Sequence, residues 1–393
     1  MHAVEQVFRE HRTRMLAALV RVLGGDMELA EDSLQDACTQ ALRSWTVVPD
    51  DPMAWLLTVA RNKAIDRIRR ARRSLSVEEV PVPAFFSSDD ALLRAGDDRL
   101  SLIFTCCHPA LSLEARVALT LQAVAGLTAF QIARAFLVPE STMAQRLVRA
   151  KRKIRDARIT FTVPSDHQLP SRLSSVLAVV YLAYTQSYVA SDRSLAAEAI
   201  RLGKLIASLM PDEPEALGLV ALMVLQESRS SARRTPSGDL VLLEDQDRSL
   251  WDQAAITEGT SLLDLALSRR SPGPYQLQAA IAAVHSQAKS FSDTDWDQIV
   301  ALYTELAVRT PSPVISLNLA VAVAMTSGPA EGLRLMDTIT GLDKFHLMHS
   351  ARADLLRRLD RFDEARTAYA RALELATEDA DRRFLRYRLN SLP

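Results

Sequence analysis

Apolar residues recur with the period of an α-helix along almost the whole chain, and residues 127–155 show this pattern most clearly. Pro139 divides the segment, because proline supplies no N–H and disfavours a helical conformation at the residue before it. After the proline, apolar residues recur at i, i+4, i+7 and i+11, which is one face of a helix. This apolar stripe consists of Met143, Leu147, Ala150 and Ile154.

The two halves of this segment predict a helix-turn-helix. Thr128 and Gln131 have the spacing of a capping box, so we expect the first helix to begin at Thr128. The side of the second helix opposite the apolar stripe is polar and basic, which suits the major groove of DNA. A solvated surface is the alternative interpretation, since rows of Arg and Lys often only face water. The polar side comprises Gln145, Arg146, Arg149, Arg152 and Lys153.

Three further amphipathic helices are predicted upstream, over Val4–Leu23, over Ala30–Trp45 and from Asp51-Pro52 onward. Two glycines end the first, and an aspartate followed by proline begins the third. The second has a buried stripe of Leu34, Cys38, Ala41 and Trp45. Its polar face either solubilises the helix or docks on a basic partner, and nothing local decides between these. That face comprises Asp32, Gln35, Asp36 and Thr39.

The third helix changes character along its length, from the apolar MAWLLTVA to the basic RNKAIDRIRRARR. A basic amphipathic helix could lie on a membrane or bind a calmodulin-like partner. However, an asparagine and an aspartate stand among the arginines, and these fit contacts to bases and phosphates better. The inward side comprises Leu57, Ala60, Ala64 and Ile68, and the opposite side comprises Asn62, Asp66, Arg69 and Arg73.

Composition limits the classes of protein that fit. The 393 residues suffice for two or three domains, and 48% hydrophobic content predicts a folded chain. With 47 basic and 48 acidic residues the chain is not a general polyanion binder, but seven basic residues cluster in 61–73 and seven in 146–158. We find no apolar run of membrane-spanning length, no signal-peptide core and no disulfide framework among three cysteines. We therefore expect a cytoplasmic protein with no membrane partner.

The run Cys106-Cys107-His108 is the one cluster that suggests metal or redox chemistry. Adjacent cysteines lack the two-residue separation with which both thiolates reach one zinc ion, and no second ligand pair follows. Cysteine is also a common core residue. Helix packing before Pro109 is therefore the preferred interpretation, with a redox or metal sensor as the alternative, and we predict no metal and no cofactor.

Residues 165–393 predict a second, entirely helical part of the chain. Near its end, small and aromatic residues match the positions of a tetratricopeptide repeat, in which small side chains let paired helices pack closely. A weaker copy lies 33 residues earlier, as counted from Glu364 back to Glu331. The matching positions are Ala353, Phe362, Ala365, Tyr369 and Ala372.

In their order, LAEDSLQDACTQALRSW, DPMAWLLTVARNKAIDRIRR and the helix-turn-helix resemble an extracytoplasmic-function sigma factor of bacterial RNA polymerase. FTCCHPAL, VLLEDQDRSLW, GPYQLQAAIAAVH and TDWDQIVALYTEL resemble the subfamily with a C-terminal helical extension. The resemblance implies that the first stretch docks on the polymerase clamp. It also implies that the second reads the promoter −10 element, with Asn62 at the position associated with a flipped base, and that the third reads the −35 element.

The residues that this resemblance assigns form three sets. For core polymerase binding they are Asp32, Leu34, Gln35, Asp36 and Thr39. For the −10 element they are Trp55, Arg61, Asn62, Lys63, Asp66, Arg67 and Arg70. For the −35 element they are Ser141, Thr142, Ala144, Gln145, Arg146, Arg149, Arg152 and Lys153. Many family members have a basic or polar residue where this chain has Ala144, so we expect its −35 preference to differ from theirs.

We thus predict an all-α protein with sigma region 2 over 1–73, a linker over 74–95, sigma region 4 over 96–160 and a tetratricopeptide-like domain over 165–393. The predicted function is promoter-specific transcription initiation with core RNA polymerase and promoter DNA as partners, without catalysis by the chain itself. We expect the extension to contact the sigma domains, with the linker residues Phe85 and Phe86 as candidates, and to modulate activity. A DNA-binding regulator that does not bind polymerase is the alternative. An enzyme is the third hypothesis, but Asp245, Asp247, His285 and His349 show no metal or triad spacing.

Overall fold

A computed structural model describes residues 2–74, 98–136, 138–190 and 193–393. In these ranges the regular structure is helical, and the β-type pairing is one isolated bridge between Arg234 and Leu240. The predicted all-α class is therefore confirmed. The chain divides into two compact units, Met1–Leu202 and Gly203–Pro393. The expected contacts of Phe85 and Phe86 lie outside the described residues.

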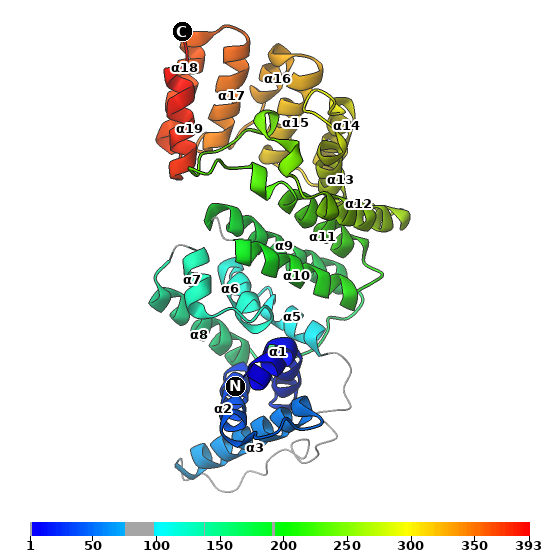
Figure 1. Cartoon of the computed structure of the whole chain (residues 1–393), viewed down its shortest axis with the longest axis vertical. Helices are drawn as coiled ribbons and strands as arrows, with labels where there is room; N and C mark the ends of the chain where they lie inside the picture. Colours follow the sequence, from blue (N-terminus) through cyan, green and yellow to red (C-terminus); the bar gives the residue numbers. More distant parts are fainter. Residues whose placement is uncertain (1, 75–97, 137, 191–192) are drawn as a thin grey trace. The chain divides into compact units, whose positions relative to one another are not determined.

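The first unit begins with three helices, α1 (His2–Val22), α2 (Met27–Ser44) and α3 (Pro52–Ser74) (Figure 1). After α1 the chain passes through Gly24 and Gly25, whose φ angles of 67° and 91° favour glycine. The Asp26 side chain accepts a hydrogen bond from the Leu29 N–H, so α2 begins earlier than the predicted Ala30. The Asp51 side chain accepts from the Ala54 N–H at 2.9 Å and caps α3 as predicted.

Four shorter helices follow: α5 (Arg99–Cys106), α6 (Leu113–Ala123), α7 (Ala129–Ala135) and α8 (Glu140–Asp156). The capping box of Thr128 and Gln131 is present at the start of α7, as its spacing predicts. The helix-turn-helix is formed by α7 and α8, which pack against each other and against α6. The residues of α8 that are buried are the predicted apolar stripe, Met143, Leu147, Ala150 and Ile154.

The first unit continues past these helices with α9 (Leu169–Ala190) and the start of α10 (Arg193–Leu209). Helix α9 packs on α5, α6 and α7. Its polar side chains bond to the ends of those helices, since Arg172 donates to the Phe104 carbonyl at 2.8 Å and Gln186 to the Ala135 carbonyl at 3.0 Å. Arg201 of α10 donates to the Ala125 carbonyl at 3.1 Å. These bonds satisfy backbone carbonyls near or just beyond the C-terminal ends of helices.

The second unit is a succession of helices in which sequential neighbours pack on each other. Proline is the first residue of several of them, at Pro214, Pro274 and Pro313. Its helices after α10 are α11 (Pro214–Glu227), α12 (Gln253–Ser268), α13 (Pro274–Gln287), α14 (Trp296–Arg309), α15 (Pro313–Thr326), α16 (Pro329–Met336), α17 (His346–Arg358), α18 (Phe362–Leu375) and α19 (Asp379–Asn390).

A segment with little regular structure connects α11 to α12 and includes the short 3₁₀ helices η2 (Ser230–Ala232), η3 (Leu243–Asp245) and η4 (Arg248–Leu250). Arg248 fixes its end: the guanidinium lies 4.5 Å from the ring of the buried Trp251 and donates to the carbonyls of His285 and Ala288 at 2.6 and 2.7 Å. This segment thus packs on α13 within the second unit.

Four of the five predicted tetratricopeptide positions lie in the core of the second unit, and the fifth, Phe362, is half-buried against it. Ala353, Ala365, Tyr369 and Ala372 are buried between α17 and α18. In the preceding helix pair, Gly332 occupies the place that Ala365 has in the later one. A Cβ atom on Gly332 would lie 2.5 Å from the Cβ of Ala324 and 2.8 Å from the carbonyl oxygen of Ala320. Close contact between α15 and α16 therefore depends on the absence of a side chain.

Replacing Gly332 with alanine should destabilise the second unit by about 1–3 kcal/mol, because the added methyl group overpacks the α15–α16 contact. Chemical denaturation of the full chain, followed by circular dichroism, measures this. The neighbouring Glu331→Ala is the control, since Glu331 makes only an exposed ion pair with Arg334 and its loss should cost little. Equal stability of the two variants would contradict the close packing.

Candidate polymerase and DNA interface

The predicted polymerase-binding face lies on α2. Asp32, Gln35 and Thr39 are exposed and Asp36 is half-buried, so these four residues share an accessible surface. The Thr39 hydroxyl donates to the Gln35 carbonyl at 3.0 Å, which keeps it on the helix. Leu34 differs, because its side chain is 2% exposed and belongs to the core. The accessible face is therefore acidic and polar, without Leu34.

An arginine of α3 spans the two carboxylates of this face. Arg67 donates to Asp32 at 2.5 Å and to Asp36 at 2.7 Å. The hydrogen bond to Asp36 is the main cause that raises the pKa of Arg67. All three side chains are more than a third exposed to solvent, so the two ion pairs contribute little to the stability of the fold. These ion pairs connect the two predicted interfaces. Arg67 is predicted to contact DNA, and its charge is balanced here by Asp32 and Asp36, which are predicted to contact polymerase.

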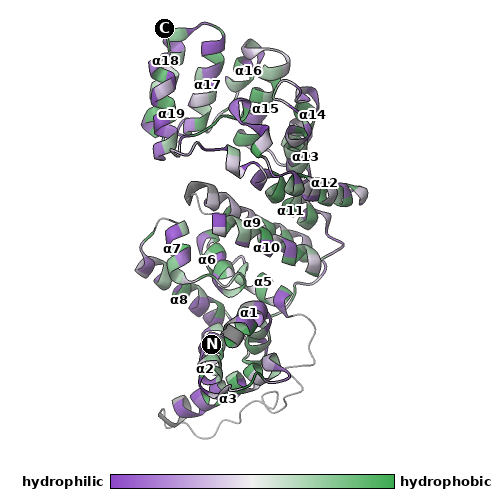
Figure 2. Ribbon diagram, viewed as in Figure 1, coloured by the Kyte–Doolittle hydropathy of each residue, from purple (hydrophilic) through white to green (hydrophobic). Residues whose placement is uncertain are grey.

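The other predicted −10 residues follow α3 along its length. Asn62, Asp66 and Arg70 are exposed, and the Trp55, Arg61 and Lys63 side chains are half-buried. Trp55 meets Trp45 edge to face, with ring centroids 5.3 Å apart. Arg70 donates to the Asp66 carbonyl at 3.3 Å. The C-terminal half of α3 is strongly hydrophilic (Figure 2), which leaves a row of polar and cationic groups available to a nucleic acid.

The predicted −35 residues lie on the accessible side of α8. The half-buried members are Ala144 and Arg146; the exposed ones are Ser141, Thr142, Gln145, Arg149, Arg152 and Lys153. All eight therefore avoid the buried stripe of that helix. Arg and Lys side chains projecting from one helix face can contact phosphates and base edges together. The predicted basic and accessible face of α8 is thus present in the structure.

Contacts inside the first unit join its N-terminal helices to the helix-turn-helix. Lys151 of α8 forms an ion pair with Glu31 of α2, and their side chains are only 12% and 19% exposed. Arg12 donates to the carbonyls of Gln122 and Ala123 at the end of α6, both at 3.0 Å. Sequence analysis missed these contacts, since their partners are more than a hundred positions apart and no local pattern relates them.

Lys151→Met should destabilise the first unit more than Arg152→Met does, by about 1–3 kcal/mol, because it leaves the Glu31 carboxylate in a confined place without its cation. Arg152 is a matched control, since it is exposed on the same helix. Thermal and denaturant unfolding of the full chain give the difference. If both variants had the same free energy of unfolding, the ion pair between Lys151 and Glu31 would not stabilise the first unit.

Within the cluster Cys106-Cys107-His108, the two cysteines lie in the core and His108 is half-buried. Both cysteine side chains are fully buried, and the Cys107 sulfur lies 3.4 Å from the Thr120 hydroxyl. Burial raises the pKa of the Cys107 thiol to about 11, so it stays protonated and poorly reactive at neutral pH. The His108 Nδ1 accepts from the Ala110 N–H at 3.1 Å. Within the described ranges, no three His, Cys, Asp or Glu residues are placed to share a metal ion.

Four segments of the chain match known protein families. Residues 7–74 match sigma-70 region 2, and residues 101–154 match sigma-70 region 4. Residues 172–267 match a family of unknown function, and residues 253–393 match a tetratricopeptide repeat-like domain. None of the described helices is long and apolar enough to span a bilayer.

Two relatives are similar to this chain over different lengths. An uncharacterized protein of Rhizobium meliloti is 41% identical over 397 residues, which cover 97% of this chain and 94% of that protein. A probable extracytoplasmic-function RNA polymerase sigma factor, SigI of Mycobacterium tuberculosis, is 31% identical over 176 residues, which cover 43% of this chain and 60% of that protein. With both sigma-70 regions, this similarity and the repeat-like domain, the chain belongs to the extracytoplasmic-function sigma factors that carry a tetratricopeptide-like C-terminal extension.

Proposed function

We propose that this protein binds core RNA polymerase through the polar face of α2 and directs transcription initiation at promoters read by α3 and α8. The observation that carries the proposal is the pairing of sigma-70 regions 2 and 4 with an exposed acidic face on α2 and a basic face on α8. Neither face is needed for the fold, because the buried stripes of both helices point the other way. Both faces are therefore accessible to partners, although Arg67 already pairs with Asp32 and Asp36 on α2.

The two DNA-reading helices would perform different steps. The basic side of α8 would bind the −35 element as duplex, with cations on phosphates and amide or guanidinium groups on base edges. The polar side of α3 would hold unpaired bases of the −10 element, where Asn62 would bond to a base taken out of the stack. Unstacking one base costs a few kcal/mol, which contacts of this kind would offset.

The C-terminal extension would modulate this activity through the first unit. Support comes from α9, which packs on α5, α6 and α7 and bonds to the carbonyls of Phe104 and Ala135. Ala135 is the last residue of α7, directly before the turn of the helix-turn-helix. A shift of α9 would therefore act on the position of α7, and through it on the orientation of α8. A tethered domain acts at high effective concentration, without a separate regulatory protein.

Run-off transcription with core polymerase tests the whole proposal. We expect promoter-dependent transcripts from the full chain, and a change of at least severalfold when the chain ends near Val163. A second truncation after Leu209 keeps α9 and α10 and thereby separates loss of their packing from loss of the second unit. Absence of core binding and of transcripts would instead favour the alternative, a DNA-binding regulator that does not use polymerase.

Full-length variants test the role of α9 without truncation. Arg172→Ala with Gln186→Ala removes both bonds to carbonyls of the helix-turn-helix domain, and should move transcript output in the same direction as the truncation near Val163. The control is Ser174→Ala, which changes an exposed position on the same helix. Output that stayed equal to the unmodified chain, with α9 still folded by circular dichroism, would remove α9 from the proposed modulation.

A further inference from the structure

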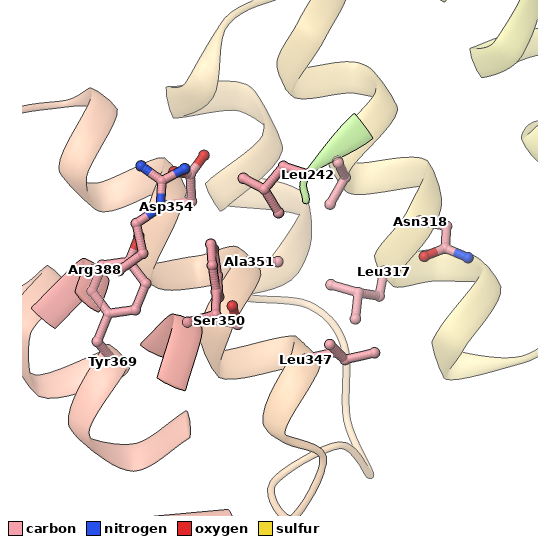
Figure 3. A pocket seen from close by; sticks show the side chains of 11 residues that line it. Leu242, Leu317, Asn318, Leu347, Ser350, Ala351, Asp354, Tyr369 and Arg388 are labelled. Carbon is pink, nitrogen blue, oxygen red and sulfur yellow. The ribbon is translucent and has the colours of Figure 1, made fainter. Parts of the chain in front are cut away.

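The second unit contains a pocket of about 280 Å³ beside its last helices (Figure 3). Side chains of α15, α17, α18 and α19 line it, and Leu242 of the segment between α11 and α12 closes part of it. Ligand pockets commonly measure about 300–1,000 Å³, so this one suits a ligand smaller than a typical drug. The segment that carries Leu242 is fastened to α19, since Arg383 donates to Asp239 at 2.5 Å.

The two ends of the pocket differ in chemistry. Asp354, Tyr369 and Arg388 lie together at one end in Figure 3, whereas Leu317 and Leu347 lie toward the other. Leu347 is 49% exposed although it is a large apolar side chain. Such an arrangement matches a molecule with one polar group and one apolar body.

The polar end holds a buried hydroxyl group beside the Arg357 guanidinium, which can donate to its oxygen but cannot accept its hydrogen. Tyr369 is 1% exposed, and its hydroxyl makes no hydrogen bond of normal geometry within the described part of the chain. Asp354 makes no hydrogen bond to this hydroxyl, and its carboxylate accepts from Arg357 at 2.8 Å. Burial raises the pKa of Tyr369, so the hydroxyl is a neutral donor. Buried polar groups are rarely left unpaired, and a ligand atom would supply the missing partner.

The same end also has a guanidinium with donors to spare. Arg388 is 20% exposed and lies 5.4 Å from the ring of Phe384. Its contact with Glu244 measures 3.6 Å, which is beyond normal hydrogen-bond length, and Glu244 is 47% exposed. Arg357 is also close to the Tyr369 hydroxyl, but it already pairs with Asp354 at 2.8 Å. A ligand carboxylate would therefore bind Arg388 in place of the longer, more exposed contact with Glu244.

We propose that this pocket binds a small carboxylate with an apolar body. The carboxylate would accept hydrogen bonds from Arg388 and Tyr369, and the apolar body would lie against Leu317 and Leu347. A short-chain or aromatic free acid has this chemistry, and so does the last residue of a peptide with a free C-terminus. The proposal concerns binding by the second unit and holds whether or not the chain initiates transcription.

Titration calorimetry on the full-length chain tests binding with two named probes, hexanoate and 3-phenylpropionate. We expect at least one to bind with a Kd between about 10 µM and 1 mM, which is reasonable for a ligand of this size. The matching alcohols, 1-hexanol and 3-phenylpropan-1-ol, are controls for the carboxylate. A tripeptide ending in leucine, with a free or an amidated C-terminus, distinguishes a peptide source from a free acid. If no probe bound, or acid and alcohol bound alike, the proposal would be overturned.

Variants connect the binding to the pocket. Arg388→Met should weaken the bound acid about tenfold or more and Tyr369→Phe about threefold to tenfold, because each removes a hydrogen bond to a charged group. The control is Arg386→Met, an exposed arginine on the same helix, which should bind as the unmodified chain does. Tyr369→Phe keeps the aromatic ring in the core and decides the matter if Arg388→Met does not fold. Unchanged affinity in a folded Arg388→Met or Tyr369→Phe variant would place the ligand elsewhere.

Discussion

Asp36→Lys should lower the affinity of this protein for core RNA polymerase by about tenfold or more. The substitution changes the charge of the α2 face by two units, and a like charge opposite a basic partner surface costs several kcal/mol when the two are held together. The fold should remain, since Asp36 is partly exposed and its ion pair with Arg67 contributes little to stability. A pull-down with purified core polymerase and a competition titration measure the loss.

The control for this variant is Asp264→Lys, which makes the same charge change at an exposed position of α12 in the second unit. If the two variants bound core polymerase equally well, with unchanged circular dichroism, the α2 face would not be the docking surface. A general effect of net charge would lower the affinity of both variants for core polymerase, whereas a local effect at the α2 face would lower only that of Asp36→Lys.

Arg67 offers an independent check on the same face. In the structure its guanidinium donates hydrogen bonds to Asp32 and Asp36, so polymerase must compete with Arg67 for these carboxylates. Arg67→Gln removes the competing cation while keeping a polar side chain. If the carboxylates dock on polymerase, core binding should be retained or strengthened while capture of −10 DNA falls.

Sequence patterns over a few neighbouring residues were enough to predict much of the fold. The stripe from Met143 to Ile154 is buried because helical period alone decides which side of α8 faces the core. The capping box of Thr128 and Gln131 and the aspartate cap before Pro52 likewise depend on residues only three positions apart. Leu34 follows the same rule, since its place in the apolar stripe of α2 already predicted the burial that excludes it from the exposed face.

Contacts between distant elements could not be predicted in this way. Whether Lys151 faces DNA or Glu31 depends on how α2 and α8 pack, and its sequence neighbours are cations of the same kind. The packing of α9 was equally hidden, because an apolar helix can join either the domain before it or the one after it. The pocket beside Tyr369 depends on Leu242, which is 127 positions away, so no repeat pattern indicates it.

Arg149→Ala and Asn62→Ala should impair different steps of initiation. Arg149 is exposed on α8, where a phosphate or a base edge of the −35 element is its expected partner. Its loss should weaken binding to duplex promoter DNA by roughly 1–3 kcal/mol if it reads a base, or lower the salt dependence by about one unit if it holds a phosphate.

Asn62→Ala should leave duplex binding intact, because an exposed amide on α3 matters only once a −10 base is unpaired. Binding of holoenzyme to duplex promoter DNA at several salt concentrations isolates the first step, and fluorescence of 2-aminopurine in the −10 element isolates opening. Arg149→Ala with premelted promoter should recover part of its output, whereas Asn62→Ala should not recover, since its contact is with the unpaired base itself. Loss of the same step in both variants would mean that the two helices do not divide promoter recognition between duplex and single strand.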